Sequence, residues 1–196
     1  MTTKRHAASA TLSLVVLTTP AWAHTGHGEA SGIVAGFLHP ITGIDHLLAI
    51  VSVGVVAGLA AGRARLAVPA AFIAFMALGG MLGMNGLALP FVEPAIALSV
   101  VVLGLLMASG ARVGLEALIG IAAAAAIFHG AAHGGELPAG ASAVSFSLGF
   151  LTSTGLMLAA GLLAGLGLAR FAVPGRWVRP LLGLGTATAG MTMLVS

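Results

Sequence analysis

Six apolar stretches separated by short loops run through this 196-residue chain, at roughly 32–61, 66–89, 92–111, 113–133, 141–169 and 174–195. Each is long enough to cross the hydrocarbon core of a bilayer, which takes about 20 helical residues. Lys, Arg, Asp and Glu make up only 7% of the chain, against about 25% in soluble domains. So few charges cannot coat a water-soluble globule, which excludes a cytosolic enzyme, a nucleic-acid binder and a disordered chain. We predict an all-α, polytopic membrane bundle with six transmembrane helices.

The N-terminal residues have the pattern of a secretory signal peptide. Lys4 and Arg5 precede an apolar run at 7–16, and residues 20–23 (Pro-Ala-Trp-Ala) resemble a cleavage site. The apolar run is too short to span a membrane, so an uncleaved first helix is the less favoured alternative. We therefore predict that 1–23 is a cleaved signal peptide.

Cleavage after Ala23 would leave a periplasmic tail at 24–31, followed by a six-helix transmembrane domain at 32–196. The tail carries His24 and His27. A free amino terminus beside an imidazole chelates metal ions, so these two histidines are candidate capture ligands. An ordinary solvated tail explains them equally well.

The arginines of the mature chain occur only in alternate loops. They are Arg63, Arg65, Arg112, Arg170, Arg176 and Arg179. The intervening loops, around 85–93 and 134–142, contain none. By the positive-inside rule, the loops with arginine face the cytoplasm. The predicted location is the bacterial inner membrane, with several passes and with both termini in the periplasm.

Small residues recur at a spacing of four in several predicted spans. The glycines in this pattern are Gly54, Gly58, Gly62, Gly79, Gly83, Gly161 and Gly165. Such stripes allow helix backbones to approach closely in lipid, where apolar burial gives no drive for association. We assign them to helix packing.

The first span contains ionisable side chains, which are costly inside a membrane and indicate function. The sequence there is His39-Pro40-Ile-Thr-Gly43-Ile-Asp45-His46. Proline removes a backbone donor, so we expect the helix to break near Pro40, with this proline starting a second helical piece. Asp45 and His46 are adjacent, about 100° apart on a helix, so one can bind an ion while the other orients it.

A second group ends the fourth span, at His129, His133 and Glu136. The two histidines are at i and i+4, a spacing that puts two imidazoles on one helix face for a metal. The chain has no Cys, so imidazole and carboxylate are the strong ligands available. A single histidine inside a membrane often makes only an interhelical hydrogen bond. Two groups facing the same side of the membrane favour metal binding.

These two motifs, placed in the first and fourth spans behind a signal peptide, resemble the HupE/UreJ family over essentially the whole mature chain. The resemblance implies a nickel or cobalt permease that supplies hydrogenase or urease maturation. It also implies that the cation is handled by His39, Asp45, His46, His129, His133 and Glu136. Family members often carry a further histidine in the fifth span, where this chain has Thr154-Gly155-Leu156.

We therefore expect a transporter without catalytic residues or a prosthetic group, which binds Ni²⁺ or Co²⁺ transiently between spans 1 and 4. Its partners are the cation and the lipid bilayer but no nucleic acid, and a homo-oligomer is compatible with this interpretation. The two three-span halves, oppositely oriented, would match an inverted repeat. The alternatives are an intramembrane metal-dependent hydrolase and a metal-binding accessory protein on the periplasmic side.

Overall fold

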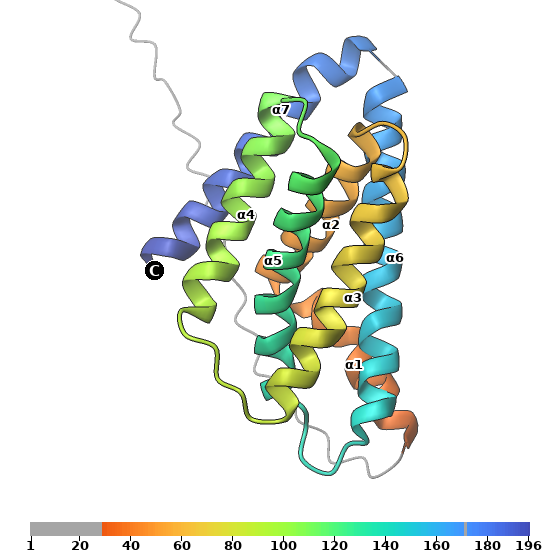
Figure 1. The fold of residues 1–196 in the computed structure, drawn as a ribbon, viewed down its shortest axis with the longest axis vertical. Helices are drawn as coiled ribbons and strands as arrows, with labels where there is room; N and C mark the ends of the chain where they lie inside the picture. The colour runs from red at the N-terminus through yellow and green to blue at the C-terminus, as the bar shows by residue number, and fades with distance from the viewer. Residues whose placement is uncertain (1–28, 171) are drawn as a thin grey trace, which may run out of the picture.

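The computed structural model describes residues 29–170 and 172–196, which form α-helices joined by short loops (Figure 1). The helices are α1 Glu29–Thr42, α2 Ile44–Leu59, α3 Ala64–Met84, α4 Val92–Ser109, α5 Leu115–Gly135, α6 Ala143–Arg170 and α7 Ala172–Val195. Five of them, α3 to α7, hold apolar segments long enough to cross a membrane, and α1 with α2 qualifies as a bent pair, giving up to six spans. The predicted all-α bundle is confirmed. The predicted signal peptide lies outside the described residues, and α1 already begins within the last residues of the predicted tail.

The first span is broken, but the break does not begin its second helix at Pro40. This proline lies inside the last turn of α1, where it removes the one hydrogen bond that its N–H would otherwise donate to the preceding turn. The Thr42 hydroxyl donates to the His39 carbonyl at 2.8 Å. The chain then turns by 82° at Gly43, whose extended backbone separates α1 from α2.

The helices pack mainly in pairs. Helix α2 packs along α6, α3 along α5, and α4 along α7, while α1 also packs against α6. Further contacts join α2 to α3, α4 and α5, which places α2 at the centre of the bundle (Figure 1).

Glycines form the closest helix contacts, as the spacing predicted. A Cβ at Gly54 or Gly58 would collide with carbonyl oxygens of α6, and one at Gly79 or Gly83 with carbonyl oxygens of α5. Gly62 is an exception, because it lies in the loop after α2, with φ +63° and no other atom close to its Cβ position. Its role is therefore to make a turn that other residues rarely adopt, and not to pack helices.

The loops of the bundle gather at two ends (Figure 1). One end, called here the arginine end, holds the loops at 60–63 and 110–114 and the last turn of α6. The opposite end, called the histidine end, holds the loops at 85–91 and 136–142 and the start of α1. Arginine-bearing segments that are far apart in sequence thus meet at one end, as the alternation of loops predicted.

Candidate metal site

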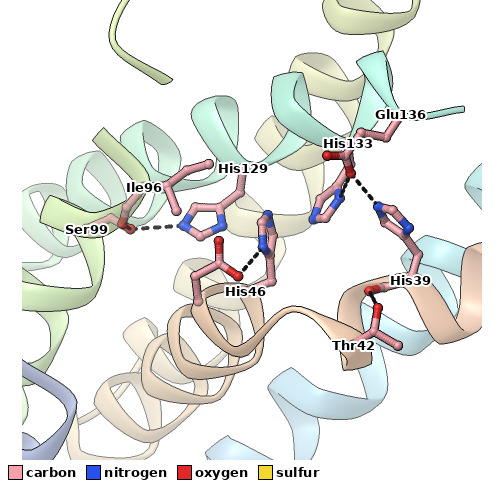
Figure 2. A network of polar contacts seen from close by, with 9 residues as sticks. His39, Thr42, His46, Ile96, Ser99, His129, His133 and Glu136 are labelled. Carbon is pink, nitrogen blue, oxygen red and sulfur yellow. Dashed lines mark hydrogen bonds and ion pairs between the residues drawn. The ribbon is translucent and has the colours of Figure 1, made fainter. Parts of the chain in front are cut away.

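The α1–α2 break faces the last two turns of α5 and brings six predicted site residues together (Figure 2). They are His39, Asp45, His46, His129, His133 and Glu136. The first three come from the two sides of the break at Gly43, and the others come from the C-terminal part of α5. A Cβ at Gly43 would lie 2.9 Å from Asp45 Oδ1 and 3.1 Å from His46 Nδ1, so a larger residue there would press on this pair.

His39, His133 and Glu136 form an outer group at the histidine end. One ligand atom from each of these three residues lies within 4.8 Å of the other two. His39 Nε2 is 2.9 Å from Glu136 Oε2, and His133 Nδ1 is 3.5 Å from the same oxygen. Metal–nitrogen bonds of about 2.1 Å hold neighbouring ligand atoms roughly 3 Å apart, so small side-chain movements would make these atoms converge on one ion. Glu136 is mostly exposed, which leaves the group open to solvent.

The imidazoles continue inward from the outer group as a row of neighbouring rings. The ring centroids of His39 and His133 are 4.5 Å apart, and those of His133 and His46 are 3.8 Å apart. His46 and His129 follow at 4.6 Å. The side chain of His39 is 26% exposed, whereas His133, His46 and His129 are buried, with exposed fractions of 5%, 7% and 0%, so the row leads from the surface into the protein interior.

His46 is held by its neighbour Asp45. Its Nδ1 lies 2.9 Å from Asp45 Oδ1, and a carboxylate only accepts, so Nδ1 donates. The proton on Nδ1 leaves Nε2 with a free lone pair in the neutral ring. This Nε2 atom is buried and has no hydrogen-bond partner. Asp45 therefore orients an imidazole whose other nitrogen is available to a ligand, as carboxylates do behind metal-bound histidines.

His129 is held in a similar way by Ser99 of α4 (Figure 2). The Ser99 hydroxyl has one proton, which it donates to the Ile96 carbonyl at 2.7 Å. It must therefore accept from His129 Nε2, which is 3.0 Å away. The remaining nitrogen, Nδ1, is buried without a partner.

Neither nitrogen of the buried His133 ring makes a hydrogen bond, and only Nδ1 has a polar neighbour, Glu136 Oε2 at 3.5 Å, so Nε2 is the orphaned atom. Buried polar atoms are normally satisfied, so a set of orphaned imidazole nitrogens on three adjacent rings indicates a ligand site. Nitrogen ligands of this kind suit Ni²⁺, Co²⁺, Cu²⁺ and Zn²⁺. The donor set of the site therefore fits a divalent transition metal.

Several neighbours of the site were not identified from the sequence. Ser99 is the only polar side chain between Glu93 and Ser109, and this isolation within an apolar span was the available signal. Phe150 packs its ring against His133 and His39, with centroids at 4.7 Å and 6.3 Å. Nothing in the apolar pattern of α6 distinguishes this phenylalanine from an ordinary core residue.

The hydroxyls of α6 behave in two ways. Thr152 donates to the carbonyl of its own helix at Leu148, at 2.7 Å, as such residues usually do. Ser153 and Thr154 are buried, and their hydroxyl oxygens have no partner. They lie one helical turn further along α6 than Phe150, on the side away from the histidine end.

The two other predicted ligands are His24 and His27. Both lie outside the described residues.

Comparison with known proteins gives a consistent result along the chain. The family model described as HupE / UreJ protein matches residues 12–193. Protein HupE of Rhizobium leguminosarum bv. viciae is 41% identical over 186 residues, which cover 94% of this chain and 96% of that protein. No solved structure matches the chain.

Proposed function

The chain belongs to the HupE/UreJ family, which is associated with nickel and cobalt uptake, and on this premise we propose that it transports a divalent transition metal across the bacterial inner membrane. The proposed substrate is Ni²⁺, or Co²⁺, bound transiently and not as a resident cofactor. In the proposed orientation the histidine end and both termini face the periplasm, and the arginine end faces the cytoplasm. Metal supplied in this way would serve the maturation of a nickel enzyme such as hydrogenase or urease.

The observation that carries the proposal is the row of imidazoles with orphaned nitrogens. On His46 and His129, one nitrogen is anchored by Asp45 or Ser99 and the other is buried without a partner. A purely structural histidine inside a membrane would be expected to satisfy both nitrogens. The arrangement instead leaves lone pairs pre-oriented for an ion.

The proposed path begins at the outer group, where Glu136 is open to solvent and adds negative charge for capture. His133 belongs to the outer group and also neighbours His46, so it can pass the ion inward by exchanging one ligand at a time. Asp45 offsets the charge of the cation beside His46 and His129. Binding to successive weak sites allows an ion to leave as well as enter.

An intramembrane hydrolase remains the alternative, because an apolar cavity of about 380 Å³ borders His133. This cavity lies between α3, α5 and α6, and its wall includes Met76, Phe146 and Phe150. A hydrolase would use it to hold a lipid or peptide next to a metal-activated water.

Uptake of labelled nickel and cobalt into cells tests the proposal. We expect His46→Ala and His133→Ala to abolish accumulation at matched amounts of membrane-inserted protein. Glu116→Gln, which changes an exposed carboxylate at the arginine end, is the control and should accumulate metal normally. Wild-type accumulation by both histidine variants would refute the proposed site. Metal-dependent hydrolysis by the purified protein, without uptake in cells, would favour the enzyme.

A further inference from the structure

A second large cavity lies at the arginine end, remote from the histidines. Its volume is about 760 Å³, and residues of α2 to α7 and of the connecting loops line it. Three arginines from three different segments meet there: Arg63 after α2, Arg112 after α4, and Arg179 in α7. The positive-inside rule explains why arginines are at this end, but it does not require them to share one cavity.

The chain supplies almost no negative charge to balance them. Of its five carboxylate side chains, Glu29, Asp45, Glu93 and Glu136 belong to elements at the histidine end. The fifth, Glu116, is exposed in the first turn of α5 and does not line the cavity. Among the described residues, no arginine lies within ion-pair distance of a carboxylate. An anion that pairs with these arginines would therefore come from outside the chain.

Arg179 shows the need for a counter-charge most clearly. It is only partly exposed, and its Nε atom is buried without a hydrogen-bond partner. Its guanidinium occupies the space that a side chain at position 110 would fill, and Gly110, with φ +63° at the end of α4, leaves that space free. A desolvated, unpaired guanidinium donor is costly unless an anion accepts from it.

The rest of the cavity wall indicates what kind of anion fits. Val56, Leu59, Leu106, Leu118 and Leu168 line it beside the arginines. An amphiphile can satisfy both surfaces, with its phosphate on the guanidinium groups and its apolar part on the aliphatic side chains. Arginine binds phosphate through paired N–H donors, and basic pockets between transmembrane helices on the cytoplasmic side bind anionic lipid headgroups.

We propose that the cavity at the arginine end binds the phosphate headgroup of an anionic phospholipid, held by Arg63, Arg112 and Arg179. The leaflet rests on the orientation proposed above, in which this end faces the cytoplasm. Binding itself does not depend on transport of metal. A bound headgroup would join the ends of α2, α4 and α7 and neutralise the positive charge that a departing cation meets.

The test is native mass spectrometry of the purified full-length protein released from micelles doped with one defined lipid. The probes are phosphatidylglycerol, phosphatidylcholine and, in a separate arm, inorganic phosphate at matched ionic strength. Arg63→Gln and Arg112→Gln change exposed side chains and should fold normally. Arg170→Gln is the matched control, because it removes the same charge from the same end but does not line the cavity.

We expect wild type and Arg170→Gln to retain phosphatidylglycerol in preference to phosphatidylcholine. Each cavity substitution should weaken retention roughly fivefold, the effect of removing about one favourable arginine–headgroup interaction. Unchanged retention by the Arg63→Gln/Arg112→Gln double variant, or an equal loss in Arg170→Gln, would overturn the proposal. Retention of inorganic phosphate equal to the retention of phosphatidylglycerol would also overturn the proposal, because a soluble anion would then suffice.

Discussion

Asp45 and Ser99 each hold one nitrogen of an imidazole whose other nitrogen is unpartnered. Their side chains orient histidines and, in the proposed site, act behind the metal. Partners of this kind typically change metal affinity by 10–100-fold when removed. Substitutions at these two positions therefore separate the effects of charge, hydrogen bonding and stability.

Asp45→Asn tests the charge behind His46. The amide oxygen can still accept from His46 Nδ1, so the orientation of the ring should survive while the negative charge is lost. We expect nickel affinity of the purified protein, measured by isothermal titration calorimetry, to fall about tenfold. The nickel affinity of Asp45→Ala, which loses the hydrogen bond as well, should fall further. Equal affinities of wild type and Asp45→Ala would show that Asp45 does not support a metal ligand.

Ser99→Ala tests the anchor of His129. The substitution leaves His129 Nε2 buried without an acceptor, and an unsatisfied buried donor costs about 1–3 kcal/mol. We expect a lower unfolding temperature and weaker nickel binding. Ser109→Ala removes a hydroxyl at the exposed end of the same helix, where water can replace its bonds to the Leu106 carbonyl and the Ala111 N–H, so nickel binding should not change and the unfolding temperature should change less than in Ser99→Ala. If both variants behave alike, the Ser99–His129 hydrogen bond has no role in the site.

The sequence predicted the ligand candidates residue by residue and an orienting role within the Asp45–His46 pair, but it did not predict the support from Ser99. His129 and His133 share a helix face because of their i,i+4 spacing, which is a local property. The contact of His46 with these two rings joins residues more than 80 positions apart and depends on how α2 packs against α5. Ser99 comes from yet another helix, and no local pattern specifies its partner.

At the scale of helices, the lengths of the apolar stretches in the sequence predict the boundaries of the spans. They do not predict where the first span bends between α1 and α2. Pro40 is the strongest helix breaker in the first span, yet α1 continues through it to Thr42. A proline near a helix end removes a single hydrogen bond, and the turn is made where Gly43 permits close approach of Asp45 and His46. The bend therefore lies at the glycine and not at the proline.

Gly54→Ala tests the contact of α2 with α6. A Cβ at this position would meet backbone atoms of α6, including the Leu158 carbonyl oxygen, which cannot move without shifting the helix. We expect destabilisation of about 1–3 kcal/mol, as for other overpacked sites, seen as a lower unfolding temperature in micelles. Gly155→Ala on α6, where a Cβ meets nothing within 4 Å, is the control and should be neutral or stabilising. Equal effects of the two changes would contradict the close helix contact.

At the scale of the whole molecule, the helix pairs follow the symmetry that an inverted repeat requires. The first span packs on the fifth, the second on the fourth, and the third on the sixth. Exchanging the two three-span halves replaces the first span by the fourth, the second by the fifth and the third by the sixth. The pair of the first and fifth spans then becomes the pair of the fourth and second, and the pair of the third and sixth is unchanged. The close glycine contacts are related in the same way. Gly58 of the first span contacts α6, the fifth span, towards the arginine end, and Gly134 of the fourth span contacts α3, the second span, towards the histidine end. The weak similarity of the halves in sequence gave little indication of this pairing.

The proposed orientation of the bundle predicts which end is accessible to a reagent from each side of the membrane. The chain has no cysteine, so a single introduced thiol is the only site for a membrane-impermeant maleimide. Ala88 and Ala111 are exposed, in loops at the histidine end and the arginine end respectively. We expect Ala88→Cys to react in cells whose outer membrane alone is permeable, because the loops without arginine should face the periplasm.

Ala111→Cys should react only after the inner membrane is also disrupted, and the cysteine-free parent should not react in either condition. Labelling of Ala111→Cys before disruption, with Ala88→Cys protected, would mean that the bundle is inserted the other way. The outer group of His39, His133 and Glu136 would then face the cytoplasm. A solvent-open carboxylate beside two imidazoles would in that case collect metal for export. The same pair of thiols therefore decides which side of the membrane the outer group faces.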